Sequence, residues 1–273
     1  MMVREGQQFW KMSGSGNDFI FFDDRSGELK DLAETAMIDR LCARATGIGA
    51  DGVVFLQADE AEVFKIRYFP RDGSLAELCG NASLCSAKLA VHLGIASPDG
   101  FRFQTDAGLI SARISGGAPE IDLRPVRDLL PSVDIEPRHS ELRLGFADTG
   151  VPHLVVLVPS IKLVDVIARG RALRHDSALP EGANVNFVAR EKSGTWGIRT
   201  FERGVEGETL ACGTGAVASA VLLKEWGLSG AETILTTKSG GLLTVTLGSN
   251  GGTTGPSLRG EGRLVFAGRL GDV

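Results

Sequence analysis

Two cysteines of this 273-residue chain open similar motifs. Cys79 begins Cys-Gly-Asn and Cys212 begins Cys-Gly-Thr-Gly, and a mostly apolar stretch follows each motif. Such a stretch predicts a buried helix, so each thiol is expected at a helix N-terminus. The unpaired backbone N–H groups and the positive end of the helix dipole lower the pKa of a thiol there and favour the thiolate. Either cysteine could therefore serve as a base.

The glycines beside these cysteines leave backbone N–H groups open to a ligand, and helix starts of this kind bind carboxylates or phosphates. Two thiols flanking one anion site could remove a proton from one face of a carbon and return it from the other. That reaction is a racemisation or an epimerisation. The developing enediolate needs preorganised donors in a dry cavity. No lysine stands in a recognisable Schiff-base context, so a cofactor-independent reaction is expected.

The chain repeats itself with an offset of 132 or 133 residues. Ile-Arg-Tyr-Phe at Ile66 recurs as Ile-Arg-Thr-Phe at Ile198, and the two motif cysteines lie 133 residues apart. Each apolar stretch ends at a glycine, Gly94 or Gly227, that lies 15 residues after its cysteine. We therefore interpret the chain as two copies of one α/β unit.

This duplication predicts the fold class and the place of the thiols. Helices are expected over residues 82–93 and 216–226. We predict an α/β (α+β) fold with two pseudo-twofold-related domains, each a curved, mostly antiparallel sheet wrapped around a central helix. The first domain is expected over residues 1–124, with the C-terminal strand 263–273 returning to it, and the second over 125–262. The pseudo-twofold would bring both thiols to one cleft.

Composition narrows the expected partners and compartment. The net charge is −5 and the pI is about 5.5, without a run of Lys or Arg, so a small-molecule ligand is expected rather than nucleic acid or a membrane. The N-terminus lacks the apolar core of a signal peptide and no apolar run could span a bilayer, which predicts a cytoplasmic protein. The cysteine spacing predicts no zinc site, and Cys42 and Cys85 are expected to be small buried hydrophobes.

A series of motifs resembles the diaminopimelate epimerase family. The motifs run in order from residue 9 to about residue 245, and the block around the second cysteine is the most specific. They are Met12-Ser13-Gly14-Ser15-Gly16-Asn17-Asp18-Phe19, Asp72-Gly73-Ser74, Cys79-Gly80-Asn81, Pro152-His153, Gly182-Ala183-Asn184-Val185-Asn186-Phe187, Glu202-Arg203-Gly204 and Glu208-Thr209-Leu210-Ala211-Cys212-Gly213-Thr214-Gly215.

The resemblance implies a cytoplasmic homodimer that converts LL-diaminopimelate to the meso form, without metal or pyridoxal phosphate, for lysine and peptidoglycan precursor synthesis. It implies that Cys79 and Cys212 are the two acid/base thiols. It also implies that His153 and Glu202 lie near them and assist proton movement. The substrate-binding residues that it implies are Asn17, Gly80, Asn81, Asn184, Glu202, Arg203, Gly213 and Thr214.

Several of these assignments have a physical basis and a simpler alternative. Arg203 offers a planar fork for a carboxylate and Glu202 suits an ammonium, although neighbours of this kind are commonly a solvated surface pair. Asn17 and Asn184 lie in Gly-rich segments, where Asn also serves to satisfy backbone groups. A single histidine such as His153 is more often structural.

The sequence departs from the family pattern at the expected distal end of the substrate. Family members commonly carry Asn where Pro70 and Val151 stand, and some carry Gln where Gly52 stands. Residues 82–84 replace the family's Gly-x-Arg. Pro70 and Val151 have no side-chain amide, so a cofactor-independent racemase of another amino acid, for example histidine, is the alternative on the same fold.

Two other classes of protein are alternatives to these enzymes. A nucleotide-binding fingerprint would need a third glycine where Ala218 stands, and no Lys-Ser/Thr pair completes a phosphate loop. A non-catalytic descendant would not need both thiols.

Two opposed reactive thiols also predict a reversible disulfide between Cys79 and Cys212 on oxidation.

Overall fold

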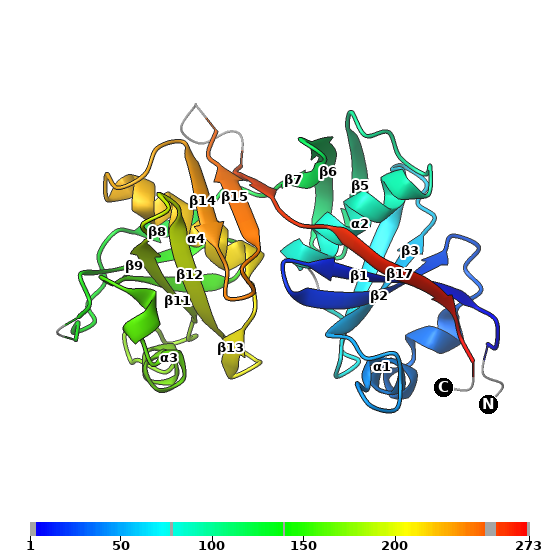
Figure 1. Cartoon of the computed structure of the whole chain (residues 1–273), viewed down its shortest axis with the longest axis horizontal. Coiled ribbons are helices and arrows are strands. Elements are labelled where there is room, and N and C mark those ends of the chain that lie inside the picture. Colours follow the sequence, from blue (N-terminus) through cyan, green and yellow to red (C-terminus); the bar gives the residue numbers. More distant parts are fainter. Residues whose placement is uncertain (1–3, 77–78, 139, 249–254, 272–273) are drawn as a thin grey trace. The chain divides into compact units, whose positions relative to one another are not determined.

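The computed structural model describes residues 4–76, 79–138, 140–248 and 255–271. It divides the chain into two compact units. The first comprises Met1–Ile121 together with Gly260–Val273, and the second comprises Asp122–Arg259. Each unit combines one mixed sheet with a long helix (Figure 1). The predicted sheet-dominated α+β fold is therefore confirmed.

The strands of the first unit form a mixed sheet in which β17, β1, β2, β3, β4, β5 and β6 are successive neighbours. The pairs β2/β3 and β4/β5 are parallel, and the others are antiparallel. The elements of this unit are β1 (Gln8–Gly14), β2 (Asn17–Asp24), a 3-10 turn (Lys30–Ala33), α1 (Thr35–Cys42), β3 (Gly52–Gln57), β4 (Lys65–Pro70), α2 (Gly80–His92), β5 (Phe101–Thr105), β6 (Gly108–Ser115), β7 (Ala118–Asp122) and β17 (Arg263–Arg269).

The second unit repeats this pairing. Strands β9, β10, β11, β12, β14 and β15 follow one another, with β10/β11 and β12/β14 parallel. The elements are β8 (Arg127–Leu130), β9 (Arg143–Asp148), β10 (Pro152–Leu157), a 3-10 turn (Ile161–Leu163), α3 (Val166–Arg174), β11 (Asn184–Arg190), β12 (Trp196–Glu202), β13 (Gly207–Thr209), α4 (Gly213–Glu225), β14 (Glu232–Thr236), β15 (Leu242–Thr246) and β16 (Ser257–Arg259).

The two long helices, α2 and α4, are the central elements of their units. Both are 13 residues long and largely buried, because their residues are small or apolar on nearly every face. Helix α2 packs against β1, β6 and β17, and α4 packs against β9, β10, β11 and β15. The predicted pattern of one buried helix in each copy is therefore confirmed.

Both helices begin earlier than predicted, at Gly80 and Gly213 rather than at residues 82 and 216. The reason is that each cysteine is itself the N-cap: its backbone is extended, and its carbonyl accepts the first helical bond, over 2.9 Å for Cys79 and 3.0 Å for Cys212. Both helices end as expected, because Gly94 and Gly227 follow them with φ of +70° and +72°.

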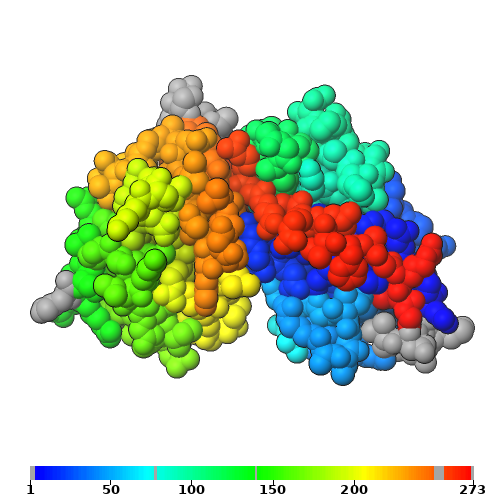
Figure 2. All heavy atoms as spheres, viewed as in Figure 1, coloured from blue at the N-terminus to red at the C-terminus, as the bar shows by residue number. Residues whose placement is uncertain are grey.

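Apolar cores hold each sheet in place. In the first unit, α1 and the strands β1 to β4 enclose a cluster that includes Phe22, Phe55 and Ile38. In the second, α3 packs against β11 and β12, and the cluster there includes Phe187 and Phe201. Strand β17, red in Figure 2, lies across the surface of the first unit with most of its residues exposed. None of the described helices is long and apolar enough to cross a membrane.

Candidate active site

The start of α2 holds Cys79, which is partly buried and caps the helix. The neighbouring residues Gly80 and Asn81 are buried in the first helical turn. Strand β1 ends against this turn at Gly14, where a Cβ atom would lie 3.0 Å from the Asn81 carbonyl oxygen. Gly14 therefore allows the strand to approach the helix start that carries the thiol.

The start of α4 holds Cys212 in the same way. The sulfur of Cys212 accepts a hydrogen bond from the backbone N–H of Gly215 over 3.4 Å and lies 3.5 Å from the Thr214 hydroxyl. The helix N-terminus thus supplies donors directed at this sulfur, which is the arrangement that stabilises negative charge on it. Gly213 and Gly215 are buried beside it.

The two remaining cysteines lie in different surroundings. Cys42 and Cys85 are buried, as predicted. Burial raises the pKa of the Cys42 thiol to about 11, and it raises that of Cys85 well above the usual value. Both are therefore protonated thiols at neutral pH.

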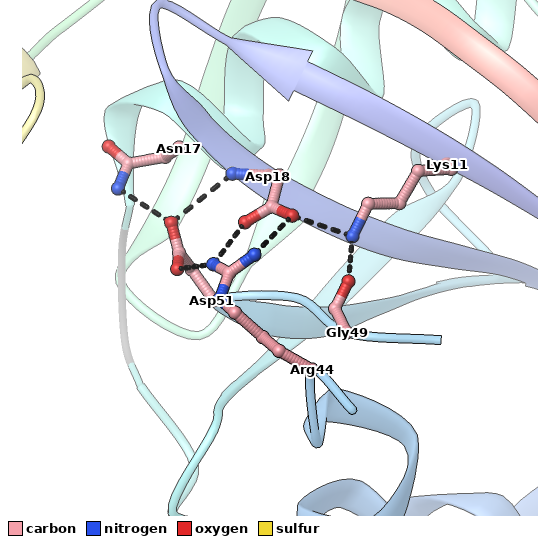
Figure 3. Close-up of polar contacts among 6 residues, drawn as sticks. All are labelled: Lys11, Asn17, Asp18, Arg44, Gly49 and Asp51. Carbon is pink, nitrogen blue, oxygen red and sulfur yellow. Dashed lines mark hydrogen bonds and ion pairs between the residues drawn. The ribbon is translucent and has the colours of Figure 1, made fainter. Parts of the chain in front are cut away.

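A chain of side-chain hydrogen bonds leads to Asn81 in the first unit, and Figure 3 shows its bond between Asn17 and Asp51. Asn81 Nδ2 donates to Asn17 Oδ1 over 2.7 Å, and Asn17 Nδ2 donates to Asp51 Oδ2 over 3.1 Å. Because a carboxylate only accepts, Asp51 determines which way both amides point. Asn81 Oδ1 is left buried and without a hydrogen-bond partner among the described residues. A ligand donor such as an ammonium would satisfy it.

An ion pair with Arg44 holds Asp51 in place (Figure 3). Arg44 donates to Asp51 over 2.6 Å and to both carboxylate oxygens of Asp18 over 2.8 and 3.1 Å. Lys11, which is 7% exposed, lies 2.7 Å from Asp18 and also donates to the Gly49 carbonyl. Burial alone would raise the pKa of Asp18, but the hydrogen bonds from Arg44 and Lys11 lower it overall. The carboxylate of Asp18 is thus held ionised.

In the second unit, Asn184 and Arg203 lie at the neighbouring ends of β11 and β12. Asn184 Oδ1 accepts from the backbone N–H of Arg203 over 2.8 Å, and Asn184 Nδ2 donates to the Pro152 carbonyl over 3.3 Å. The amide of Asn184 therefore joins three strand ends. The guanidinium of Arg203 donates to the Glu181 carbonyl over 3.1 Å, and Glu202 is the last residue of β12.

His153 lies at the start of β10 and pairs with Asn184 in the parallel ladder. Its side chain is fully buried, and burial, with a smaller contribution from the positive charge of Arg203, lowers its pKa to about 3. The imidazole is therefore neutral at neutral pH. Any part that His153 takes in proton movement therefore starts from the neutral ring.

The structure brings the predicted residues together in two groups. Asn17, Cys79, Gly80 and Asn81 meet at the start of α2. The residues that meet around the start of α4 and the ends of β10, β11 and β12 are His153, Asn184, Glu202, Arg203, Cys212, Gly213 and Thr214. Among the described residues, no group of three His, Cys, Asp or Glu side chains is placed to hold a metal ion.

Sequence reasoning missed two side chains that organise these groups. Asp51 precedes β3 and Asn186 lies within β11, where every residue from Asn184 to Ala189 is buried. The signal for Asn186 was a polar residue inside a buried strand, because a buried amide needs hydrogen-bond partners. Asp51 carried no such signal, since the Asn17 amide that it orients lies 34 residues away in the chain.

Comparisons with known proteins agree with this architecture. The family model described as diaminopimelate epimerase matches residues 9–123 and 145–265. A diaminopimelate epimerase from Gemmatimonas aurantiaca is 49% identical over 96% of this chain and 98% of its own length. One from Aquifex aeolicus is 39% identical over 96% of this chain and 97% of its own length.

Solved structures share the fold at lower identity. A hydroxyproline epimerase from Agrobacterium vitis has a TM-score of 0.70 at 17% identity, covering 99% of this chain and 94% of its own. A phenazine biosynthesis protein from Enterococcus faecalis has a TM-score of 0.76 at 15% identity, covering 97% and 99%. On the strength of the family model and of relatives aligned over nearly the whole sequence, this chain belongs to the diaminopimelate epimerase family.

Proposed function

We propose that this protein is an isomerase that interconverts LL- and meso-diaminopimelate in lysine and peptidoglycan precursor synthesis. Membership of the diaminopimelate epimerase family over nearly the full sequence is the observation that carries the proposal. The matched helix-capping cysteines support it, because the reaction needs one group that removes the α-proton and another that supplies a proton.

The proposed mechanism uses Cys79 and Cys212 as the two acid/base groups. A thiolate takes the α-proton and becomes a thiol, and the C–H electron pair moves into the substrate carboxylate to form an enediolate. The other thiol then gives its proton to the opposite face of the carbon and becomes the thiolate. Backbone N–H groups at the two helix starts stabilise the enediolate, which is commonly the largest contribution to such a reaction.

Polar side chains in each unit are suited to holding the ends of the substrate. The buried Oδ1 of Asn81 can accept a hydrogen bond from an ammonium group. Arg203 provides a guanidinium for the distal carboxylate, and Glu202 provides a carboxylate for the second ammonium. The mechanism requires that the two units present both sulfurs to one stereocentre. The proposed limits of these domains are at residues 124/125 and 262/263.

Two further features belong to this proposal as predictions from the resemblance. The protein is expected to be a cytoplasmic homodimer, and it is expected to work without pyridoxal phosphate or metal. Sedimentation of the purified protein would test the dimer, and activity after dialysis against a chelator would test the metal independence.

An isotope experiment tests the proposed reaction. Purified protein is incubated with LL-diaminopimelate in deuterated water, and the products are separated by chirality and analysed by mass spectrometry. We expect the meso isomer carrying one deuterium at the inverted α-carbon. Absence of both the meso product and deuterium would reject the substrate assignment.

The same experiment distinguishes the alternative racemase. A panel of single L-amino acids that includes histidine is incubated in parallel. We expect deuterium in diaminopimelate and none in the panel. Exchange in histidine without exchange in diaminopimelate would favour the alternative, which the residues Pro70 and Val151 motivate.

A further inference from the structure

A buried polar cluster of three side chains crosses the strands β10, β11 and β12 of the second unit. Asn186 Nδ2 lies 3.0 Å from His153 Nδ1 and 3.2 Å from the Leu154 carbonyl oxygen, and the Thr200 hydroxyl donates to Asn186 Oδ1 over 2.9 Å. His153 and Asn186 are fully buried, and Thr200 is 3% exposed. Neither Asn186 nor Thr200 has a role in the proposed proton transfer.

The contacts of Asn186 determine the tautomer of His153. The Leu154 carbonyl can only accept, so the amide atom beside it must be the NH2 group. The same NH2 group faces His153 Nδ1, which must therefore present its lone pair. A neutral imidazole has a single N–H, and here it must be at Nε2. His153 is held as the Nε2–H tautomer.

The Nε2–H group of His153 is a donor without an acceptor. Nε2 is buried and has no hydrogen-bond partner among the residues that the structure describes. A buried donor left unsatisfied costs stability. A hydrogen-bond acceptor that reaches this atom would recover that cost, and an anionic acceptor would gain most from it.

The first unit shows that the fold does not need this polar cluster. By ladder register, Phe19, Val54 and Tyr68 occupy the positions that correspond to His153, Asn186 and Thr200, because Phe19 pairs with Gly52 as His153 pairs with Asn184. Val54 likewise pairs with Tyr68 as Asn186 pairs with Thr200. Phe19 and Tyr68 form an edge-to-face contact, with ring centroids 5.8 Å apart. One copy of the unit thus uses aromatic packing where the other uses hydrogen bonds.

The cluster lies against the helix start that carries Cys212. A Cβ atom at Gly215 would lie 2.2 Å from Asn186 Oδ1 and 3.3 Å from the Cys212 sulfur. Gly215, in the first turn of α4, thus lies directly against the amide of Asn186. Arg203, next to Asn184, is close enough to affect the charge of His153.

We propose that Asn186 is a positioning residue that holds His153 as a neutral Nε2–H donor for the carboxylate of the bound substrate, so that His153 does not carry a proton in the reaction. This inference rests on the proposed function for the identity of the acceptor. Asn186 acts through His153 to stabilise the substrate carboxylate on which negative charge develops. Proton transfer is left to the two thiols.

Nuclear magnetic resonance of the whole protein with 15N-labelled histidine tests the tautomer without any substrate. We expect the His153 ring, identified by its loss in His153→Gln, to carry its proton at Nε2 throughout pH 5–8. In Asn186→Asp the new carboxylate can only accept, so the proton should move to Nδ1. A cationic ring, or an Nδ1–H ring in the unsubstituted protein, would overturn the proposal.

Kinetics of matched variants test the role. Asn186→Asp should lower kcat/KM by about 10²-fold, the scale of losing one preorganised donor, chiefly through kcat. The control Ser219→Ala removes a buried hydrogen bond of similar kind, from Ser219 to the Gly215 carbonyl, without touching His153, and should stay within about threefold of the unsubstituted protein. Equal losses in the two variants would show a merely structural role.

Two substitutions of the histidine separate a donor from a proton carrier. His153→Gln keeps an amide donor near the Nε2 position, and His153→Asn does not reach it. We expect His153→Gln to retain at least tenfold more activity than His153→Asn, with the unchanged pH profile of a group that does not titrate. Equal inactivity of both variants would contradict the donor role. If the unsubstituted protein fails to convert diaminopimelate, the proposed function fails, while the tautomer measurement still decides the role of Asn186.

Discussion

Cys79 and Cys212 share one backbone conformation, with φ/ψ of −136°/117° and −137°/109°, and each directly precedes a 13-residue helix. The same serine hydroxyl-to-carbonyl bond then recurs one turn further along, from Ser86 to Ala82 and from Ser219 to Gly215. The duplicated unit therefore presents its cysteine on the same backbone geometry twice, although only the Cys212 sulfur accepts a side-chain capping bond. Two equivalent groups are what a proton transfer in both directions requires.

Replacement of either capping cysteine tests this equivalence. Cys79→Ala and Cys212→Ala should each lower turnover of LL-diaminopimelate by about 10²-fold or more, because each thiol carries one direction of proton transfer. Cys42→Ala is the control, since Cys42 is a buried thiol that belongs to the core of the first unit. Ordinary rates in either capping variant, measured by chiral separation of the products, would show that the two-thiol mechanism is wrong.

Asp51 should control substrate binding through Asn17. In Asp51→Asn the side chain can donate as well as accept, so the orientation of Asn17 and hence of Asn81 is no longer determined. We expect KM for diaminopimelate to rise about tenfold, the scale of one lost charge-assisted hydrogen bond. Asp18→Asn is the matched control, because Asp18 pairs with Arg44 and Lys11 without touching the Asn17 amide. A KM that rises equally in both variants would argue against this relay.

The neutral state of His153 should appear in the pH dependence of stability. Burial lowers the pKa of His153 to about 3, whereas the same group in the unfolded chain titrates near its usual value of 6.5. Between pH 3 and pH 6.5 the unfolded state binds one more proton than the folded state. The free energy of unfolding therefore decreases as the pH falls below 6.5, and the contribution of His153 is complete above that pH. The contribution of His153 to the slope approaches about 1.4 kcal/mol per pH unit near pH 5.

Urea unfolding between pH 5 and pH 7 measures this slope. Asp18 adds little in that window, because its pKa starts from 3.8 and is lowered by folding. The His153→Gln variant should lose the histidine contribution and show a flatter dependence. An identical slope for the two proteins would mean that His153 takes up a proton in the folded state.

Gly215 should tolerate no side chain. An alanine Cβ would lie 2.2 Å from Asn186 Oδ1, so the Asn186 amide or the first turn of α4 must move. We expect Gly215→Ala to lower kcat/KM at least tenfold, on the order of the loss of a positioned catalytic group. Gly230→Ala is the control, because a Cβ there meets nothing within 4 Å. Comparable activity of the two variants would show that Asn186 can shift without consequence.

The amino-acid sequence by itself determined the features that depend on neighbouring residues. Both central helices are marked by the glycines after Cys79 and Cys212 and by the terminating Gly94 and Gly227. The sequence shows them because caps and left-handed C-termini are local properties of the backbone. The 132-residue repeat determined the fold class, since two copies of one pattern must build two similar units. The family motifs are likewise contiguous.

Only the tertiary structure decided which polar groups meet. Asp51 reaches Asn17 across 34 residues, Asn17 reaches Asn81 across 64, and Asn186 reaches His153 across 33. No periodicity predicts such pairs, because the strands that carry them become neighbours only when the sheet forms. Whether an amide donates or accepts, and so whether His153 is a donor or a base, follows from those neighbours rather than from the residue type.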